Sequence, residues 1–207
     1  MFEMFRSFKL NNQATPGKPD AGEKGGAVQH YEIGMELARR QQFPEALREF
    51  KRAAAREPRW AEVHFNIGVT CDHLGRPAES VKAYQQALTL KADYAEAYNN
   101  LGLAHAGLGQ YLEAVKAYRQ ASRLKPDYAE PLNNLGVLYF NAGTYQEAIG
   151  VLNRALKLNP KYAMAYYSLG LVYVEIKDKE SAQSACEKLL ELDAQLAHEL
   201  LHAIDQI

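Results

Sequence analysis

The sequence is poor in the residues that build disulfide frameworks, membrane spans and nucleic-acid surfaces. Its 207 residues include 2 cysteines and 1 tryptophan, too few for a disulfide scaffold. No apolar run approaches the ~18 residues of a membrane-spanning helix, and the N-terminus lacks the hydrophobic segment of a signal peptide. The 24 basic and 25 acidic residues are interspersed and leave a net charge of −1. This argues against nucleic-acid binding, which requires a clustered basic surface.

Glycine recurs in this chain at a constant interval, at Gly34, Gly68, Gly102, Gly136 and Gly170. Alignment on these glycines divides the chain into five units of equal length: 27–60, 61–94, 95–128, 129–162 and 163–196. A fixed period of this length is typical of a stack of equivalent supersecondary units. A stack of this kind predicts an extended surface that holds a partner.

Each unit contains two amphipathic segments with helical spacing. Gly75, Gly109 and Gly143 follow the first segment, as glycine does at a helix C-terminus. Small residues at repeated positions would let the two helices approach closely. Cys71 and Cys186 fall on packing positions of the repeat, so we expect two buried free thiols. Such thiols suit a reducing compartment, and the sequence predicts a cytoplasmic protein.

The pattern resembles the tetratricopeptide repeat, a helix–turn–helix unit whose period matches the spacing of the glycines. The resemblance is clearest in "AEAYNNLGLAHAGLGQYLEAVKAYRQASRLKPDY" and "AEPLNNLGVLYFNAGTYQEAIGVLNRALKLNPKY", the third and fourth units. It implies an all-α fold, a right-handed α-solenoid of five helix–turn–helix units. Members of this family are non-enzymatic binding proteins, so we expect no catalytic residues, no cofactor and no metal.

The two ends of the chain depart from the repeat. Residues 1–26 are rich in glycine, proline and charge after a short amphipathic start, and we expect a flexible segment. The stretch 1–10 contains three phenylalanines and two basic residues. It could be a frayed terminus, a peripheral membrane contact, or a ligand for the groove of the same or a neighbouring chain. Residues 197–207 continue a helical pattern and are predicted to be a capping helix.

That capping segment also contains an H-E-x-x-H sequence, which His198, Glu199 and His202 form. Two histidines at this spacing bind zinc in metalloproteases, with the glutamate as general base. A catalytic zinc requires a third protein ligand, and Asp205 is the sole ionisable residue that follows. A zinc hydrolase therefore remains a remote alternative to the capping role.

The resemblance implies that the first helix of each unit lines a concave groove. The predicted peptide-binding residues are Tyr31, Met35, Phe65, Asn66, Val69, Asn99, Asn100, Leu103, Asn133, Asn134, Val137, Phe140, Tyr167 and Leu171. Asparagine recurs at one repeat position, as Asn66, Asn100 and Asn134. Its amide could pair with the backbone of an extended peptide, or it could brace adjacent helices.

The predicted function is that of a non-enzymatic adaptor or scaffold that binds a peptide segment or helix of another protein. Glu62, Asp72, Glu96, Glu130 and Glu175 give the groove an acidic character, so we expect an apolar ligand with some basic residues. The alternatives are a scaffold that self-assembles or is recruited to a membrane through the N-terminal segment. No nucleic-acid partner is expected.

Overall fold

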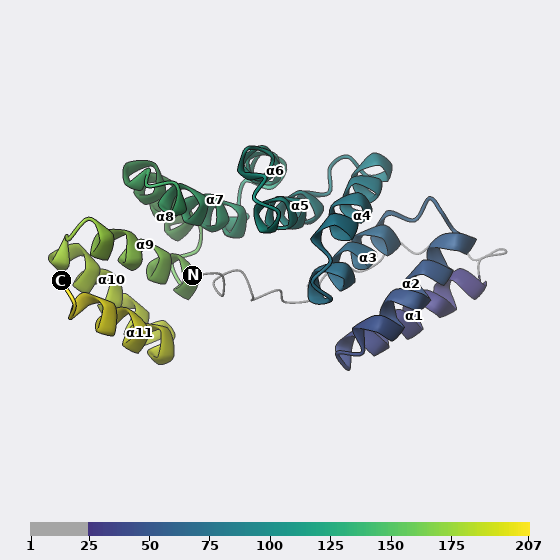
Figure 1. Cartoon of the computed structure of the whole chain (residues 1–207), viewed down its shortest axis with the longest axis horizontal. Helices are drawn as coiled ribbons and strands as arrows, with labels where there is room; N and C mark the ends of the chain where they lie inside the picture. Colours follow the sequence, from purple (N-terminus) through teal and green to yellow (C-terminus); the bar gives the residue numbers. More distant parts are fainter. Residues whose placement is uncertain (1–24) are drawn as a thin grey trace. The chain divides into compact units, whose positions relative to one another are not determined.

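The computed structural model describes residues 25–207, which form eleven helices and no β-strand (Figure 1). The helices are α1 (Gly25–Arg39), α2 (Phe43–Arg56), α3 (Ala61–His73), α4 (Pro77–Leu90), α5 (Ala95–Gly107), α6 (Tyr111–Leu124), α7 (Ala129–Asn141), α8 (Tyr145–Leu158), α9 (Ala163–Glu175), α10 (Lys179–Leu192) and α11 (Ala194–Ile204). The all-α prediction is confirmed. The amphipathic stretch 1–10, and nearly all of the predicted flexible segment, lie outside the described residues.

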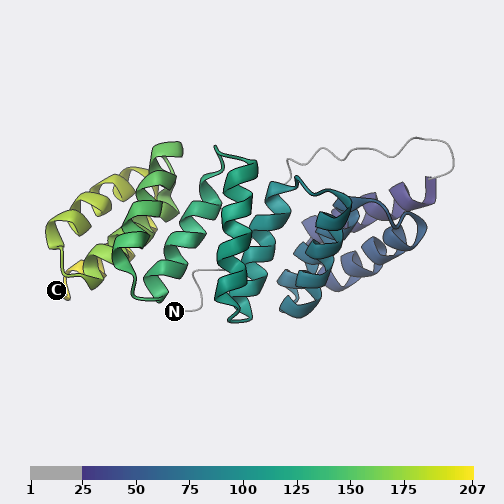
Figure 2. The ribbon, with the colours of Figure 1, turned by 90° about the horizontal axis from the view of Figure 1, so that it is seen from above.

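The chain divides into two compact units, Met1–Ala114 and Val115–Ile207, and the division falls within α6. In the first unit, α1 packs on α2 and α3 packs on α4, while α2 contacts α3, α4 contacts α5, and α3 contacts α5. In the second unit, α7 packs on α8 and α9 packs on α10, and the contacts α8–α9 and α7–α9 link the two pairs. Figure 2 shows the paired helices running side by side. Each unit is therefore a solenoid segment whose contacts join neighbouring pairs.

The turn inside each helix pair contains one residue with a left-handed backbone conformation. Gly75, Gly109 and Gly143 have φ values of 68°, 73° and 73°, in the left-handed region. Each turn closes with a hydrogen bond from the N–H of the next residue to a carbonyl five residues earlier, such as Arg76 N to Cys71 O at 2.9 Å. This is the pattern of a Schellman motif. The turns predicted from these three glycines are confirmed.

A close approach between the two helices of a pair explains the repeated glycines at Gly34, Gly68 and Gly136. A Cβ atom added to Gly68 would lie 2.5 Å from Cε1 of Tyr84, and one added to Gly136 would lie 2.5 Å from Cγ of Leu152. Tyr84 and Leu152 are fully buried. Glycine is required at both positions because the large side chain of the second helix rests on the backbone of the first.

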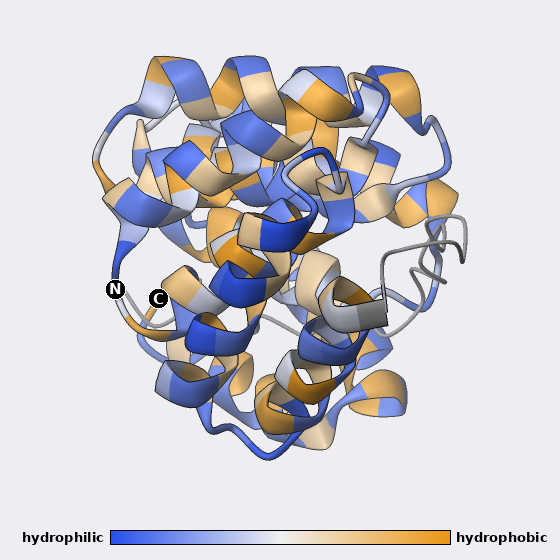
Figure 3. Cartoon of the chain, turned by 90° about the vertical axis from the view of Figure 1, so that its right-hand side faces the viewer, coloured by the Kyte–Doolittle hydropathy of each residue, from blue (hydrophilic) through white to orange (hydrophobic). Residues whose placement is uncertain are grey.

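Helix α11 departs from this pattern at the C-terminal end. It packs on both α9 and α10, and a Cβ added to Gly170 would meet Leu200 of α11 rather than a residue of α10. Leu200 and Ile204 are buried in a cluster with Cys186 and Leu189 of α10. Figure 3 shows the alternation of hydrophobic and hydrophilic residues along individual helices. In α11, Ala197, Leu200 and Ile204 are buried, whereas His198, Glu199 and His202 are exposed.

Candidate partner-binding surface

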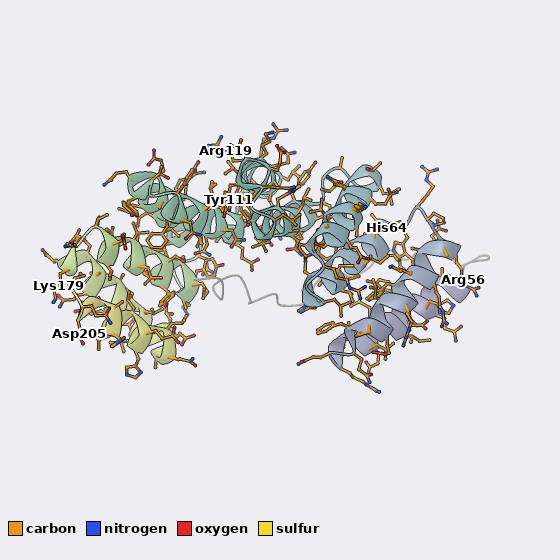
Figure 4. The ribbon with its side chains drawn as sticks, in the orientation of Figure 1. Arg56, His64, Tyr111, Arg119, Lys179 and Asp205 are labelled. Carbon is orange, nitrogen blue, oxygen red and sulfur yellow. The ribbon has the colours of Figure 1, made fainter. Side chains whose placement is uncertain are left out.

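Within each compact unit, the first helices of successive pairs contact one another: α3 contacts α5, and α7 contacts α9. In each unit they form one layer, and the second helices α2, α4, α8 and α10 pack against it. Side-chain hydrogen bonds also join a second helix to the first helix of the next pair. Arg119 of α6, labelled in Figure 4, donates from Nη2 to the Tyr139 hydroxyl of α7 at 3.0 Å.

Half of the fourteen residues predicted to line a groove are buried within the fold. They are Tyr31, Phe65, Asn66, Val69, Asn99, Asn133 and Val137. Each of these side chains is covered by its neighbours in the fold. Tyr31, for example, packs 4.6 Å from the ring of Trp60 and 5.9 Å from Phe50, measured between ring centroids. A helical period alone does not separate the side that meets the next repeat from the side that meets solvent.

The other predicted residues keep part of their surface accessible. They are Met35, Asn100 and Leu103 in the first unit, and Asn134, Phe140, Tyr167 and Leu171 in the second. Some of these side chains pack in part against the hydrophobic core. Met35, for example, packs against the cluster that contains Phe50 and Trp60. Apolar side chains that are half-buried at the rim of a core are already ordered, which lowers the entropic cost of binding a partner.

The repeated asparagine position braces neighbouring helices at Asn66 and at its counterpart Ser168. Asn66 Nδ2 donates to the Tyr31 hydroxyl at 3.1 Å and to the Glu62 carbonyl at 3.0 Å. Ser168, at the same repeat position, donates from Oγ to Asn133 Oδ1 at 3.1 Å. The bonds to Tyr31 and Asn133 join first helices of consecutive pairs across 35 residues. The bracing alternative therefore holds for Asn66 and Ser168.

A cluster of polar and aromatic side chains around α1, α3 and α5 was not recognised from the sequence. This cluster, the unit-1 polar cluster, consists of Tyr31, Glu62, Asn66, Lys91, Tyr94 and Glu96. Lys91 Nζ lies 3.7 Å from Glu62 Oε1 and 4.6 Å from the centroid of the Tyr94 ring. The sequence signal for this cluster was a lysine followed three residues later by a tyrosine at the junction between two repeats. The same spacing recurs at Lys125 and Tyr128.

Tyr94 is 4% exposed, and its hydroxyl has no hydrogen-bond partner among the described residues. Burial raises the pKa of this hydroxyl, and the negative charges of Glu62 and Glu96 raise it further.

A half-buried carboxyl, that of Asp72, lies at the C-terminal end of α3. Asp72 accepts a hydrogen bond from the Tyr84 hydroxyl at 2.5 Å. Burial raises the pKa of the Asp72 carboxyl to about 6, against the opposing effect of its hydrogen bonds with Ser80 and Tyr84. Because Tyr84 is fully buried beneath Gly68, this bond fixes the end of α3 on α4. Its function is structural.

The histidines of the H-E-x-x-H sequence are both exposed on α11. His202 Nε2 lies 3.2 Å from Nε2 of Gln206, and Asp205 is at the helix end (Figure 4). Within residues 25–207 no three His, Cys, Asp or Glu side chains are grouped so that they could hold a metal ion. The described residues thus supply no third ligand for a catalytic zinc. None of the described helices combines the length and apolarity needed to cross a membrane.

Comparison with known proteins agrees with this architecture. The chain resembles solved structures of MamA (25% identity, 84% of this chain and 94% of that chain, TM-score 0.71) and of TTC0263, a TPR protein of Thermus thermophilus (22%, 86% and 98%, TM-score 0.70). It also resembles YrrB, described as a TPR protein with an unusual peptide-binding site (21%, 87% and 93%, TM-score 0.66). No curated protein matches the sequence.

These likenesses define the class of protein as an α-solenoid of helix pairs. The profile of the tetratricopeptide repeat matches residues 31–95, 74–129, 99–161 and 133–197 in overlapping segments. The chain therefore belongs to the tetratricopeptide repeat family, whose fold is that of a protein–protein interaction scaffold.

Proposed function

We propose that this protein is a non-enzymatic scaffold that holds a segment of another protein along the accessible side of its first helices. The observation that carries the proposal is that each compact unit keeps half-buried apolar side chains on its first helices. Met35 and Leu103 supply them in the first unit, and Phe140, Tyr167 and Leu171 in the second. Such side chains provide apolar contact area, while the polar groups between them supply orientation.

The partner we propose is an apolar peptide or helix that carries some basic residues. Glu62 on α3 and Glu96 on α5 lie at the same repeat position, and Glu130 on α7 repeats it once more. Carboxylates at a constant interval favour a partner with positive charge, and opposite charge accelerates association and sets its orientation. The bound residues are proposed to include Asn100 and Asn134, whose amides both donate and accept.

Site-specific photo-cross-linking tests this proposal directly. A benzophenone amino acid placed at Leu103 on α5 or at Leu171 on α9 is expected to cross-link to a discrete partner in native lysate. Gln86 on α4 and Asn153 on α8 are exposed positions on second helices and serve as matched controls. Cross-links from the controls alone, or of equal yield at all four positions, would place the binding surface elsewhere.

Self-assembly and membrane recruitment rest on residues 1–10, which lie outside the described residues. Deletion of residues 1–26 distinguishes these two functions from partner binding by the first helices, because it removes only the first two residues of α1 from the described helices. If the deleted protein loses a high-mass species or loses liposome binding but keeps its cross-links from Leu103, the N-terminal segment has a separate role.

A further inference from the structure

Large apolar side chains are exposed together at the turn between α5 and α6. Leu108, Tyr111 and Leu112 are 38%, 57% and 79% exposed, and all three belong to the first compact unit. The turn that carries them is ordered, since the N–H of Gln110 donates to His105 O at 2.9 Å. We call these three side chains the α5–α6 patch; Tyr111 is labelled in Figure 4.

The exposure of Tyr111 is not a general property of its repeat position. The same position holds Phe43 in the first repeat and Tyr145 in the fourth, and both are half-buried. Phe43 stacks on the ring of His73 at 4.3 Å between centroids, and Tyr145 lies 6.1 Å from the ring of Phe140. Packing therefore covers the aromatic ring in α2 and α8 and leaves it exposed in α6. Exposed apolar patches of this kind mark contact sites.

The size of the α5–α6 patch limits what can occupy it. A buried aromatic side chain contributes about 150–250 Å², so a tyrosine and two leucines with these exposures offer on the order of 300 Å². A stable interface between separate chains buries about 800 Å² on each side. The patch is thus too small to hold a second copy by itself. A segment tethered to the same chain needs less area, because it meets the patch at a local concentration in the millimolar range.

The apolar N-terminal stretch, residues 1–10, is tethered at a suitable distance. Residues 11–24 connect it to α1 and span at most about 46 Å when fully extended. Helix α3 is bonded to α1 through Asn66 and Tyr31 and also contacts α5. Because packed helices lie about 8–10 Å apart and helices of this length are about 20 Å long, the α5–α6 turn is on the order of 30 Å from the start of α1. The connection is long enough to reach it.

We propose that residues 1–10 dock on the α5–α6 patch of their own chain, with phenylalanine rings packed against Tyr111 and Leu112. The three phenylalanines of this stretch recur at every third residue, a spacing that places them on one side of a helical turn. Aromatic pairs are favoured beyond the area that they bury. Since the patch lies at the α5–α6 turn and on a second helix, this contact is separate from the proposed binding surface on the first helices.

The test uses the full chain with a nitroxide attached through Asn11→Cys, next to the apolar stretch. Cys71 and Cys186 are buried, and burial raises the pKa of both thiols, so the label reacts at the introduced cysteine. We expect the nitroxide to broaden the amide resonances of residues 108–112.

Two leucine variants make the result specific. Leu112→Ser is expected to abolish the broadening, and because this side chain is 79% exposed the fold is retained. Leu190→Ser is the matched control, since Leu190 is 51% exposed on α10, and it should leave the broadening unchanged.

Chymotrypsin cleavage after the phenylalanines of residues 1–10, in the chain without the label, provides a second readout. If the untethered stretch bound with a Kd of about 0.1 mM, a local concentration of about 1 mM would keep it docked about ten times as often as free. Leu112→Ser should therefore accelerate cleavage about tenfold, whereas Leu190→Ser should not change it.

The proposal is overturned if the label leaves residues 108–112 unbroadened, or if the two leucine variants behave alike. It is also overturned if a labelled chain broadens these resonances in a second, isotope-enriched copy, which would indicate docking between chains, or if broadening requires anionic liposomes. None of these results depends on a protein partner. Failure of the docking would thus leave cross-linking from Leu103 as an independent test of the scaffold.

Discussion

Substitution of one glycine in the α7–α8 pair should reveal how close packing opposes helix propensity. A Cβ added to Gly136 would lie 2.5 Å from Cγ and 2.7 Å from Cδ2 of Leu152. Leu152 is fully buried in the second unit, so a shift of its side chain would displace the neighbours that enclose it. Overpacking of this type costs about 1–3 kcal/mol.

Gly150, on α8 of the same pair, is the internal control. A Cβ there would meet no atom within 4 Å, and Gly150 is exposed. Gly150→Ala should raise the free energy of unfolding by about 1 kcal/mol, because alanine is the better helix former. Gly136→Ala receives the same gain and also bears the steric cost, so its free energy of unfolding should lie about 1–3 kcal/mol below that of Gly150→Ala.

Urea denaturation followed by far-ultraviolet circular dichroism measures both variants. The two glycines belong to one helix pair, so one unfolding transition reports on both substitutions even if a solenoid does not unfold in a single step. Equal stabilisation by Gly136→Ala and Gly150→Ala would refute the reasoning, since it would mean that Leu152 yields to an added methyl group at no cost.

Two further predictions concern carboxylates that hold helix ends. The pKa of Asp72 is raised from 3.8 to about 6, so the folded chain binds this proton more tightly than the unfolded chain. The resulting stabilisation is present below about pH 4 and is lost as the pH rises through about 6. Asp72→Asn should abolish this pH dependence of the free energy of unfolding, which urea titrations at pH 4 and pH 7 measure. If the two proteins show the same pH profile, Asp72 is not the responsible group. Asp193 Oδ1 accepts hydrogen bonds from the N–H groups of Gln195 and Leu196, both at 3.1 Å, and Asp193→Ala should destabilise α11 by about 1 kcal/mol. Hydrogen exchange in α11 should accelerate while exchange in α3 does not change, and unaltered protection of α11 would contradict the capping role.

The turns illustrate how far a residue pattern predicts backbone conformation. Gly75, Gly109 and Gly143 indicated turns because glycine tolerates positive φ. The same turn occurs at Gln41 and Lys177, with φ values of 58° and 59°. Neither residue is a signal for this conformation, so only the repeat period could have predicted it. Here the contacts of the helix pair determine the backbone and override the preference of the individual residue.

The candidate surface was predictable to a smaller extent. The choice of first helices followed from the family resemblance, and Leu103 and Tyr167 remain accessible there. The burial of Val69 and Val137 depends on neighbouring repeats, and the period of a single helix does not contain that information. The position of Lys91 above Tyr94 depends in addition on the side-chain rotamer and on Glu62, which lies on another helix.

The amino-acid sequence by itself determined the helix pairs of this protein. A constant period repeats the same small and large residues, and because each pair is built from contacts local in sequence, the pattern suffices to predict it. Only the tertiary structure decided which side chains face another repeat and which remain for a partner. That choice depends on contacts such as Asn66 to Tyr31, made across 35 residues between helices whose mutual orientation arises when one pair packs on the next.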